Sequence, residues 1–231
     1  MKNVPLFVLA GGKATRLKHL SVDRPKYLMP VSDHETFADY HLKWARQQNF
    51  DHVILSLGHL AQQVVDYCGD GSKWGLKISY LFDGDHPLGT GGATRESLKF
   101  DFDYLAVTYG DTILSLNAQD CIQKTIQAKA LACMTVYENK VQGHTCNANF
   151  DGQKIIYDKA SPLPNWNYID YGFLVLSRKF IENFENRSPL DLADPLSQAS
   201  KNGQLMGYLC NERFWEIGSP EALQEFQLNF K

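Results

Sequence analysis

A chain of 231 residues is long enough for one large α/β domain or for two small ones. Its formal net charge of −3 excludes a nucleic-acid-binding protein that relies on a basic face. No stretch of 18 apolar residues occurs, so we expect neither a transmembrane helix nor a signal peptide, and a cytoplasmic location. The five cysteines are scattered without a C-x-x-C pair, which predicts free thiols and no zinc site.

Strand and helix patterns alternate through the first half of the chain. In chain order the patterns predict a strand at 4–9, a helix at about 36–48, a strand at 53–57, a helix at about 59–68, a strand at 78–82, a glycine-rich turn at 88–93 that opens a helix, a strand at 104–109 and a helix from about 117. Such alternation implies right-handed crossovers and a mostly parallel sheet.

Short strands dominate the second half, near 131–137, 145–150, 153–158 and 168–176. Asp151-Gly152 is a hairpin signal. Ser188-Pro189-Leu-Asp191 and Ser219-Pro220-Glu221 have the capping residue and early proline that predict helix starts. No repeat or linker interrupts the sequence, so we expect a single domain over 1–231 with a small β-rich subregion over about 140–215.

The loop after the first strand predicts a phosphate site. Gly11 and Gly12 follow the apolar run directly and leave backbone N–H groups free to wrap an anion, because glycine tolerates the backbone angles required. Arg16 and Lys26 add two cations that suit a polyphosphate. The loop is neither a Walker A motif nor a dinucleotide fingerprint. The alternative is a surface loop with scattered basic residues.

Two acidic residues are candidate metal ligands. Asp111 directly follows the strand at 104–109, where open α/β sheets bind ligands, and Gly110 before it leaves room for a ligand or metal. Asp111 could instead cap the helix near 117. Glu216 lies in a short apolar strand and must face solvent or be paired. If these two carboxylates converge, they could hold Mg²⁺.

A weaker signal is Asp83-Gly-Asp85, which resembles the D-x-D motif of metal-dependent glycosyltransferases. The match covers three residues only, and it precedes the glycine-rich turn. The histidines show no metal-binding spacing such as H-E-x-x-H. A glycosyltransferase therefore stays open as an alternative at this point.

Taken in order, the motifs resemble those of the sugar-1-phosphate nucleotidyltransferases. Leu9-Ala-Gly-Gly-Lys-Ala-Thr-Arg-Leu17 followed by Pro25-Lys26 resembles the family signature. The other matches are Leu88-Gly-Thr-Gly-Gly-Ala93 to the base-recognition turn, Gly110-Asp111 to the metal-binding pair, Asp158-Lys159 to the segment whose lysine meets the sugar phosphate, Ile169-Asp-Tyr-Gly172 to the strand with the sugar-binding glycine, and Trp215-Glu216-Ile-Gly-Ser-Pro220 to the closing element. Together they span residues 4 to about 226.

The resemblance implies a Rossmann-like α/β fold of the nucleotide-diphospho-sugar transferase type, with a mostly parallel twisted sheet and helices on both faces. It also implies roles for individual residues. These are catalysis by Arg16 and Lys26, nucleotide binding by Leu9, Ala10, Gly11, Gly12, Gly89 and Thr90, substrate binding by Gly110, Lys159 and Gly172, and Mg²⁺ binding by Asp111 and Glu216. The implied partners are a nucleoside triphosphate and a sugar 1-phosphate, with no nucleic acid or membrane, and a homodimer is compatible with it.

The subgroup that the chain resembles most is the D-glycero-D-manno-heptose 1-phosphate guanylyltransferase type, which shares the L-G-T-G-G-A turn. This implies GTP and a heptose- or mannose-like phosphate for capsule or lipopolysaccharide synthesis. Ala14, Ala160 and Glu216 depart from the usual glycine, proline and aspartate. The alternatives are CTP or UTP as donor, a non-sugar phosphate acceptor, a glycosyltransferase, and a non-catalytic nucleotide-sensing subunit.

Overall fold

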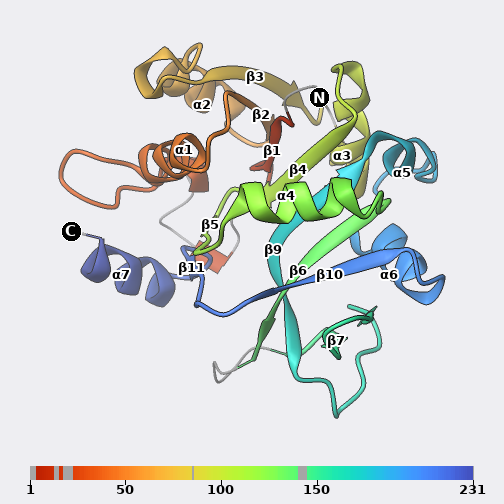
Figure 1. Cartoon of the computed structure of the whole chain (residues 1–231). Helices are drawn as coiled ribbons and strands as arrows, with labels where there is room; N and C mark the ends of the chain where they lie inside the picture. Colours follow the sequence, from red (N-terminus) through yellow and green to blue (C-terminus); the bar gives the residue numbers. More distant parts are fainter. Residues whose placement is uncertain (1–3, 13–15, 18–22, 85, 140–144, 231) are drawn as a thin grey trace.

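The structure, a computed structural model, describes residues 4–12, 16–17, 23–84, 86–139 and 145–230. Its main sheet has the strand order β10-β6-β9-β4-β1-β2-β3 (Figure 1). The strands are β1 (Leu6–Leu9), β2 (His52–Leu57), β3 (Lys77–Phe82), β4 (Tyr104–Tyr109), β6 (Ala132–Glu138), β9 (Tyr168–Ser177) and β10 (Leu205–Cys210). Only β9 runs antiparallel to its neighbours β4 and β6 in this path, so the mostly parallel sheet is confirmed.

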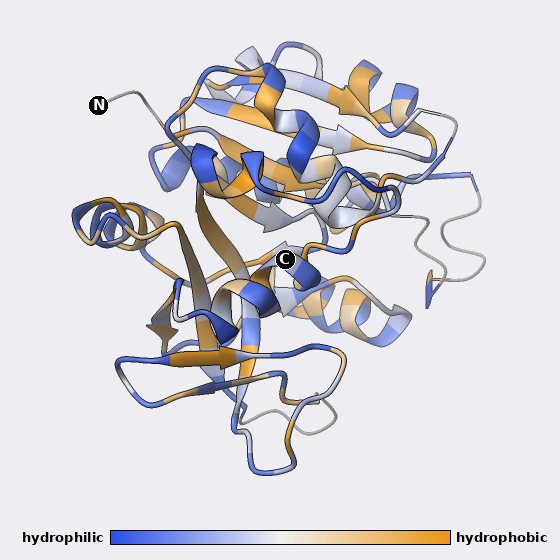
Figure 2. Ribbon diagram, turned by 90° about the vertical axis from the view of Figure 1, so that its right-hand side faces the viewer, coloured by the Kyte–Doolittle hydropathy of each residue, from blue (hydrophilic) through white to orange (hydrophobic). Residues whose placement is uncertain are grey.

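Helices cover both faces of the sheet because its central strands are apolar on both sides. In β1, Leu6 and Val8 pack into one apolar layer and Phe7 packs into the other. One layer includes α1 (Phe37–Gln47), α2 (Ala61–Cys68), α4 (Ala118–Gln127) and α7 (Pro220–Asn229). The opposite side carries α3 (Gly89–Glu96), α5 (Arg178–Glu182) and α6 (Ala193–Lys201). These helices combine hydrophobic and hydrophilic residues (Figure 2), and among the described residues none is long and apolar enough to cross a membrane.

Two small antiparallel elements accompany the main sheet. β7 (Ala148–Phe150) and β8 (Ile155–Tyr157) form the hairpin that Asp151-Gly152 predicts, and Gly152 adopts a positive φ of 95° in its turn. β5 (Thr112–Ile113) pairs with β11 (Trp215–Glu216) as a separate ribbon. Within the stretch from about 140 to 215, β9 and β10 belong to the main sheet, and the β7–β8 hairpin joins it through the pairing of β7 with β9.

The helix starts show which side chains act as caps. Asn117 caps α4, with its Oδ1 accepting a hydrogen bond from the Asp120 N–H at 3.0 Å, so Asp111 is not the cap. Ser219 caps α7 in the same way, as predicted.

The prediction of a helix start at Ser188-Pro189 is wrong. Their peptide bond is cis and α6 begins only at Ala193, because the preceding residues pair with the glycine-rich segment, the Leu190 N–H donating to the Leu88 carbonyl at 2.9 Å.

The cap of α4 can be tested by mutation. We expect Asn117→Ala to lower the free energy of unfolding by about 1 kcal/mol, because one N–H of the first turn loses its acceptor. Asn117→Asp keeps an acceptor in place and serves as the control. Urea unfolding midpoints measure both variants, and equal midpoints for Asn117→Ala and the wild type would contradict this role.

Candidate active site

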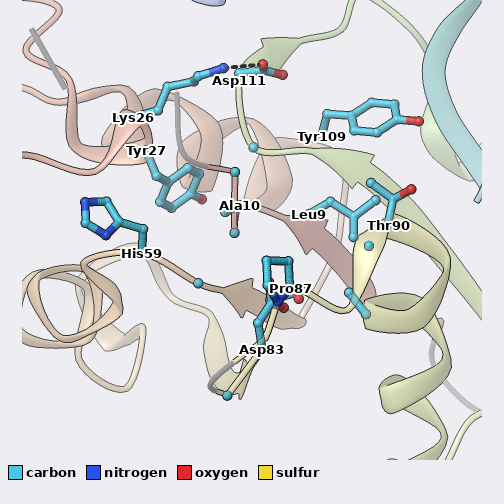
Figure 3. A pocket seen from close by; sticks show the side chains of 18 residues that line it. Leu9, Ala10, Lys26, Tyr27, His59, Asp83, Pro87, Thr90, Tyr109 and Asp111 are labelled. Carbon is cyan, nitrogen blue, oxygen red and sulfur yellow. Dashed lines mark hydrogen bonds and ion pairs between the residues drawn. The ribbon is translucent and has the colours of Figure 1, made fainter. Parts of the chain in front are cut away.

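A cavity of about 610 Å³ opens where the four parallel strands β1 to β4 end (Figure 3). Its walls come from the residues that directly follow these strands, Ala10–Gly12, Gly58-His59, Asp83-Gly84 and Gly110-Asp111. The strand order changes direction between β1 and β4, with β2 and β3 on one side and β4 on the other. Open α/β sheets bind ligands at such a position. The topology therefore marks this cavity as the candidate active site.

Lys26 and Asp111 meet at the edge of this cavity. The Lys26 Nζ lies 2.9 Å from the Asp111 Oδ2 (Figure 3), and the two side chains are only 17% and 25% exposed. The residues lie 85 positions apart in the sequence. The expected convergence of a cation from the first loop with the carboxylate after β4 is thus present.

Lys26 extends from a well-anchored backbone. It begins the short 3-10 helix Lys26–Leu28, whose Tyr27 is 1% exposed and lies with its hydroxyl 3.1 Å from the His41 Nδ1. Burial lowers the pKa of His41 to about 4, so this imidazole is neutral at pH 7. The buried neighbours fix the segment, and the lysine side chain is left to reach the cavity.

Glu216 and Arg16 lie side by side next to this pair. β11 places Glu216 opposite Thr112, and the Ile217 N–H donates to the Asp111 carbonyl at 2.9 Å. A Cβ atom built on Gly218 would lie 2.9 Å from the Glu216 Oε2 and 3.2 Å from the Arg16 Nη2. Both side chains therefore lie against the same glycine, although neither lines the cavity.

The glycines around the cavity are explained by close backbone packing. A Cβ on Gly110 would lie 2.7 Å from the Ala10 Cβ, so the absence of a side chain at Gly110 lets the first loop pack closely, and Gly110 also lines the cavity. A Cβ on Gly58 would lie 2.6 Å from the Gly11 carbonyl oxygen. Neither Gly11 nor Gly12 has a positive φ. Gly12 faces open space and can approach an anion.

Gly89 and Gly91 also make room for protein. They form the first turn of α3 and not a separate turn, and Gly89 has a positive φ of 74°. A Cβ on Gly89 would lie 2.4 Å from the Leu190 carbonyl oxygen, and one on Gly91 would lie 2.8 Å from the Leu190 Cγ. Gly89, Thr90 and Leu9 all line the cavity. Leu190 thus fixes the wall where the sequence predicted base recognition.

Lys159 and Gly172 lie outside the cavity itself. The Lys159 Nζ is 2.7 Å from the Asp191 Oδ2, and both residues line a neighbouring cavity of about 570 Å³. Gly172, with a φ of 96°, lies behind the cavity-lining Tyr109, whose ring carbon Cδ2 would be 3.4 Å from a Cβ at this position. Ala14 lies outside the described residues.

A sequence model of the nucleotidyl transferase family matches residues 6–231. The chain belongs to this family. The family expected from the motifs is therefore confirmed, and with it an enzyme that transfers nucleotidyl groups.

Relatives of this nucleotidyl transferase act with different bases, to judge from their names. It is 25% identical to D-glycero-alpha-D-manno-heptose 1-phosphate guanylyltransferase of Campylobacter jejuni over 96% of this chain and 98% of that one. It is 24% identical to a UTP–glucose-1-phosphate uridylyltransferase of Synechocystis and 26% identical to mannose-1-phosphate guanylyltransferase of Mycobacterium tuberculosis, over 90% and 94% of this chain. It spans 58% and 62% of these two longer proteins.

Solved structures share the fold. HddC from Yersinia pseudotuberculosis, complexed with GMP-PN, superposes with a TM-score of 0.80 at 24% identity, over 99% of this chain and 100% of that one. A Bacillus anthracis structure described as a glucose-1-phosphate thymidylyltransferase gives a TM-score of 0.84 at 19% identity, over 98% and 94%. At these identities the likeness concerns the fold, and it confirms the expected fold class.

One carboxylate of the nucleotidyl transferase cavity, that of Asp83, had only a weak signal in the sequence. Asp83 enters the cavity below Pro87 (Figure 3), with its Oδ2 3.2 Å from the Cβ positions of Gly11 and Gly58. Burial raises the pKa of Asp83. The motif Asp83-Gly-Asp85 suggested a metal site, but Asp85 lies outside the described residues. The signal for Asp83 was its position directly after β3, the same position that pointed to Asp111 after β4.

Asp170 of β9 is a second carboxylate that the sequence did not single out, and it lies near Tyr109 and Lys159. Burial raises the pKa of Asp170 to about 6, against the opposing effects of the Gly172 N–H, 2.9 Å from Oδ1, and of the Lys159 ammonium. The motif containing Gly172 includes Asp170, but nothing in the sequence showed that this carboxyl would be buried.

The raised pKa of Asp170 gives a pH-dependent stability. Between about pH 4 and pH 6 the folded chain binds more protons here than the unfolded chain, so this contribution to stability is present at low pH and is lost as the pH rises through 6. We expect Asp170→Asn to raise the free energy of unfolding by about 1–2 kcal/mol at pH 7.5, and by less toward pH 4.5. Urea unfolding at several pH values measures this, and a difference independent of pH would contradict it.

Proposed function

We propose that this enzyme joins a nucleoside triphosphate to a sugar 1-phosphate and releases pyrophosphate. The observation that carries the proposal is the Lys26–Asp111 pair, 2.9 Å apart, at the edge of a cavity formed by the carboxyl ends of parallel strands. The reaction needs no protein nucleophile, because the acceptor phosphate is itself the nucleophile. It needs two anionic substrates held together while their charges are neutralised.

In the proposed reaction an oxygen of the sugar 1-phosphate attacks the α-phosphorus of the triphosphate. The new P–O bond forms as the bond to the bridging oxygen breaks, and pyrophosphate leaves with its electron pair. Lys26 would stabilise the charge that builds on the α-phosphoryl group. Arg16, beside Gly218, would hold the β- and γ-phosphates, and the backbone at Gly12 offers an approach for them. Lys159 would hold the acceptor phosphate.

Asp111 and Glu216 fit a magnesium ion and are proposed as its protein ligands. The described residues contain no group of three or more His, Cys, Asp or Glu side chains that could form an all-protein metal cage. Asp111 directly precedes β5, and Glu216 of β11 is paired with its neighbour Thr112. Two carboxylates so placed suit Mg²⁺, which binds one or two carboxylates and completes its shell with water and phosphate oxygens. When bound, the ion would neutralise phosphate charge.

Asp83 supports guanine as the base that is read. It lines the cavity with its carboxylate, and the shift of its pKa comes from burial alone, without a hydrogen bond from a described residue. Guanine presents two neighbouring donors, N1–H and N2–H, and an ionised carboxylate can accept both. The two guanylyltransferase relatives, named for heptose and mannose phosphates, support GTP and a similar acceptor. We further propose that the product serves capsule or lipopolysaccharide synthesis.

Lys26→Ala tests the catalytic proposal. We expect turnover to fall about 10²–10³-fold, the usual cost of removing one positioned donor at the reacting group, while thermal unfolding shows a folded protein. Lys124→Ala, which removes an exposed lysine of α4, is the matched control. Pyrophosphate release measures both. Near-normal release by Lys26→Ala would remove Lys26 from the mechanism.

Asp83→Asn tests the choice of base. ATP, GTP, CTP and UTP are compared with a set of sugar 1-phosphates in the presence of Mg²⁺, and we expect the wild type to prefer GTP. The variant should lose about 10–100-fold in kcat/KM for GTP, because an amide donor then faces a guanine donor. Asp66→Asn, on the exposed side of α2, is the control. A strong preference of the wild type for CTP would overturn the guanylyl assignment.

A further inference from the structure

One carboxylate, that of Asp191, connects the two cavities. The Thr90 hydroxyl, in the wall of the main cavity, donates to the Asp191 Oδ1 at 3.1 Å. The Lys159 ammonium, in the neighbouring cavity, donates to the Asp191 Oδ2 at 2.7 Å. Each oxygen of the carboxylate thus has its own partner, and the two partners lie in the expected subsites for base and acceptor phosphate.

Asp191 is held rigidly in this place. Its Oδ1 also accepts the Ala193 N–H at 3.0 Å, and the Leu192 N–H donates to the Thr90 Oγ1 at 2.9 Å. The Leu190 carbonyl accepts the Gly91 N–H at 2.8 Å. Although burial opposes it, the Lys159 ammonium and the Ala193 N–H lower the pKa of Asp191, so the carboxylate is charged at neutral pH.

Lys159 is the less constrained member of the pair, because its ammonium bonds to Asp191 alone among the described residues, whereas Asp191 accepts from three donors. Its side chain is 58% exposed, and a lysine carries its charge on a flexible four-carbon stem. Since Asp191 also accepts from Thr90 in the wall of the main cavity, the ammonium lies at the border of that cavity. A phosphate that enters from the main cavity can therefore reach this ammonium only in competition with the fixed carboxylate of Asp191.

We propose that Asp191 is a positioning residue that acts as an internal anion. It holds the Lys159 ammonium at the border of the two cavities until the phosphate of the acceptor replaces the carboxylate as the partner of Lys159. This inference rests on the proposed function, because it requires Lys159 to bind the acceptor phosphate. A dianionic phosphate monoester carries more charge than one carboxylate and displaces it. Because Lys159 must leave Asp191 before it binds the phosphate, the free energy of acceptor binding is less favourable by the free energy of the Lys159–Asp191 ion pair.

Asp191→Asn tests the proposal. The Asn Oδ1 still accepts from Thr90 and Ala193, but the charge that competes for Lys159 is gone. We expect the KM of the sugar 1-phosphate to fall about two- to fivefold, the range that an exposed ion pair supplies, with little change in kcat or in the KM of the triphosphate. Asp194→Asn is the matched control, because Asp194 lines the same neighbouring cavity but pairs with Arg187.

A double-mutant cycle shows whether Asp191 acts through Lys159. In a Lys159→Met enzyme, which we expect to have a raised acceptor KM, adding Asp191→Asn should cause no further change. An acceptor KM that is unchanged or raised in Asp191→Asn alone would overturn the proposal, as would the same decrease in the Lys159→Met background. Absence of turnover in the wild type overturns the proposed function, and this proposal with it.

Discussion

The arrangement of the site depends on the contact between Lys26 and Asp111. Each charge is partly withdrawn from water, and each would be costly there without the other. The lysine comes from a loop that is anchored on α1 by buried aromatic residues, and the aspartate comes from the end of β4. Since β4 and β1 are neighbours in the sheet, the pairing of these strands brings the two charges together.

Close backbone packing is the second constraint on the site. Gly110 allows the first loop to pass over the end of β4, and Gly58 allows the same loop to pass over the end of β2. Gly89 and Gly91 allow the Leu190 segment to press against the start of α3. The walls of the cavity are therefore set by segments that touch one another without side chains between them. Rigid walls of this kind suit a site that must hold two anions in register.

The site divides into parts that correspond to the parts of the proposed substrates. Asp83 and Lys26 both line the cavity, and the proposal assigns base recognition to Asp83 and stabilisation of the α-phosphoryl charge to Lys26. Asp111 directly precedes β5, and Glu216 lies on the paired strand β11 beside Arg16. Asp191 connects Thr90 in the cavity wall to Lys159, so in the proposal one charged side chain lies between the two substrates. The proposed roles are thus distributed over short segments that come from distant parts of the sequence.

The sequence alone indicated the family, the parallel strands and several residues of the cavity, Lys26 and Asp111 among them. Apolar runs followed directly by Gly11, Asp83 and Asp111 could be recognised because both the strand and its end are local patterns. The tertiary structure decided what depends on contacts between distant segments. It showed that Gly110 accommodates Ala10, that Asn117 and not Asp111 caps α4, and that Asp191 holds Lys159. A local sequence pattern indicates the conformation of a segment. Which distant segment packs against it is fixed only when the strands pair and the hydrophobic core forms.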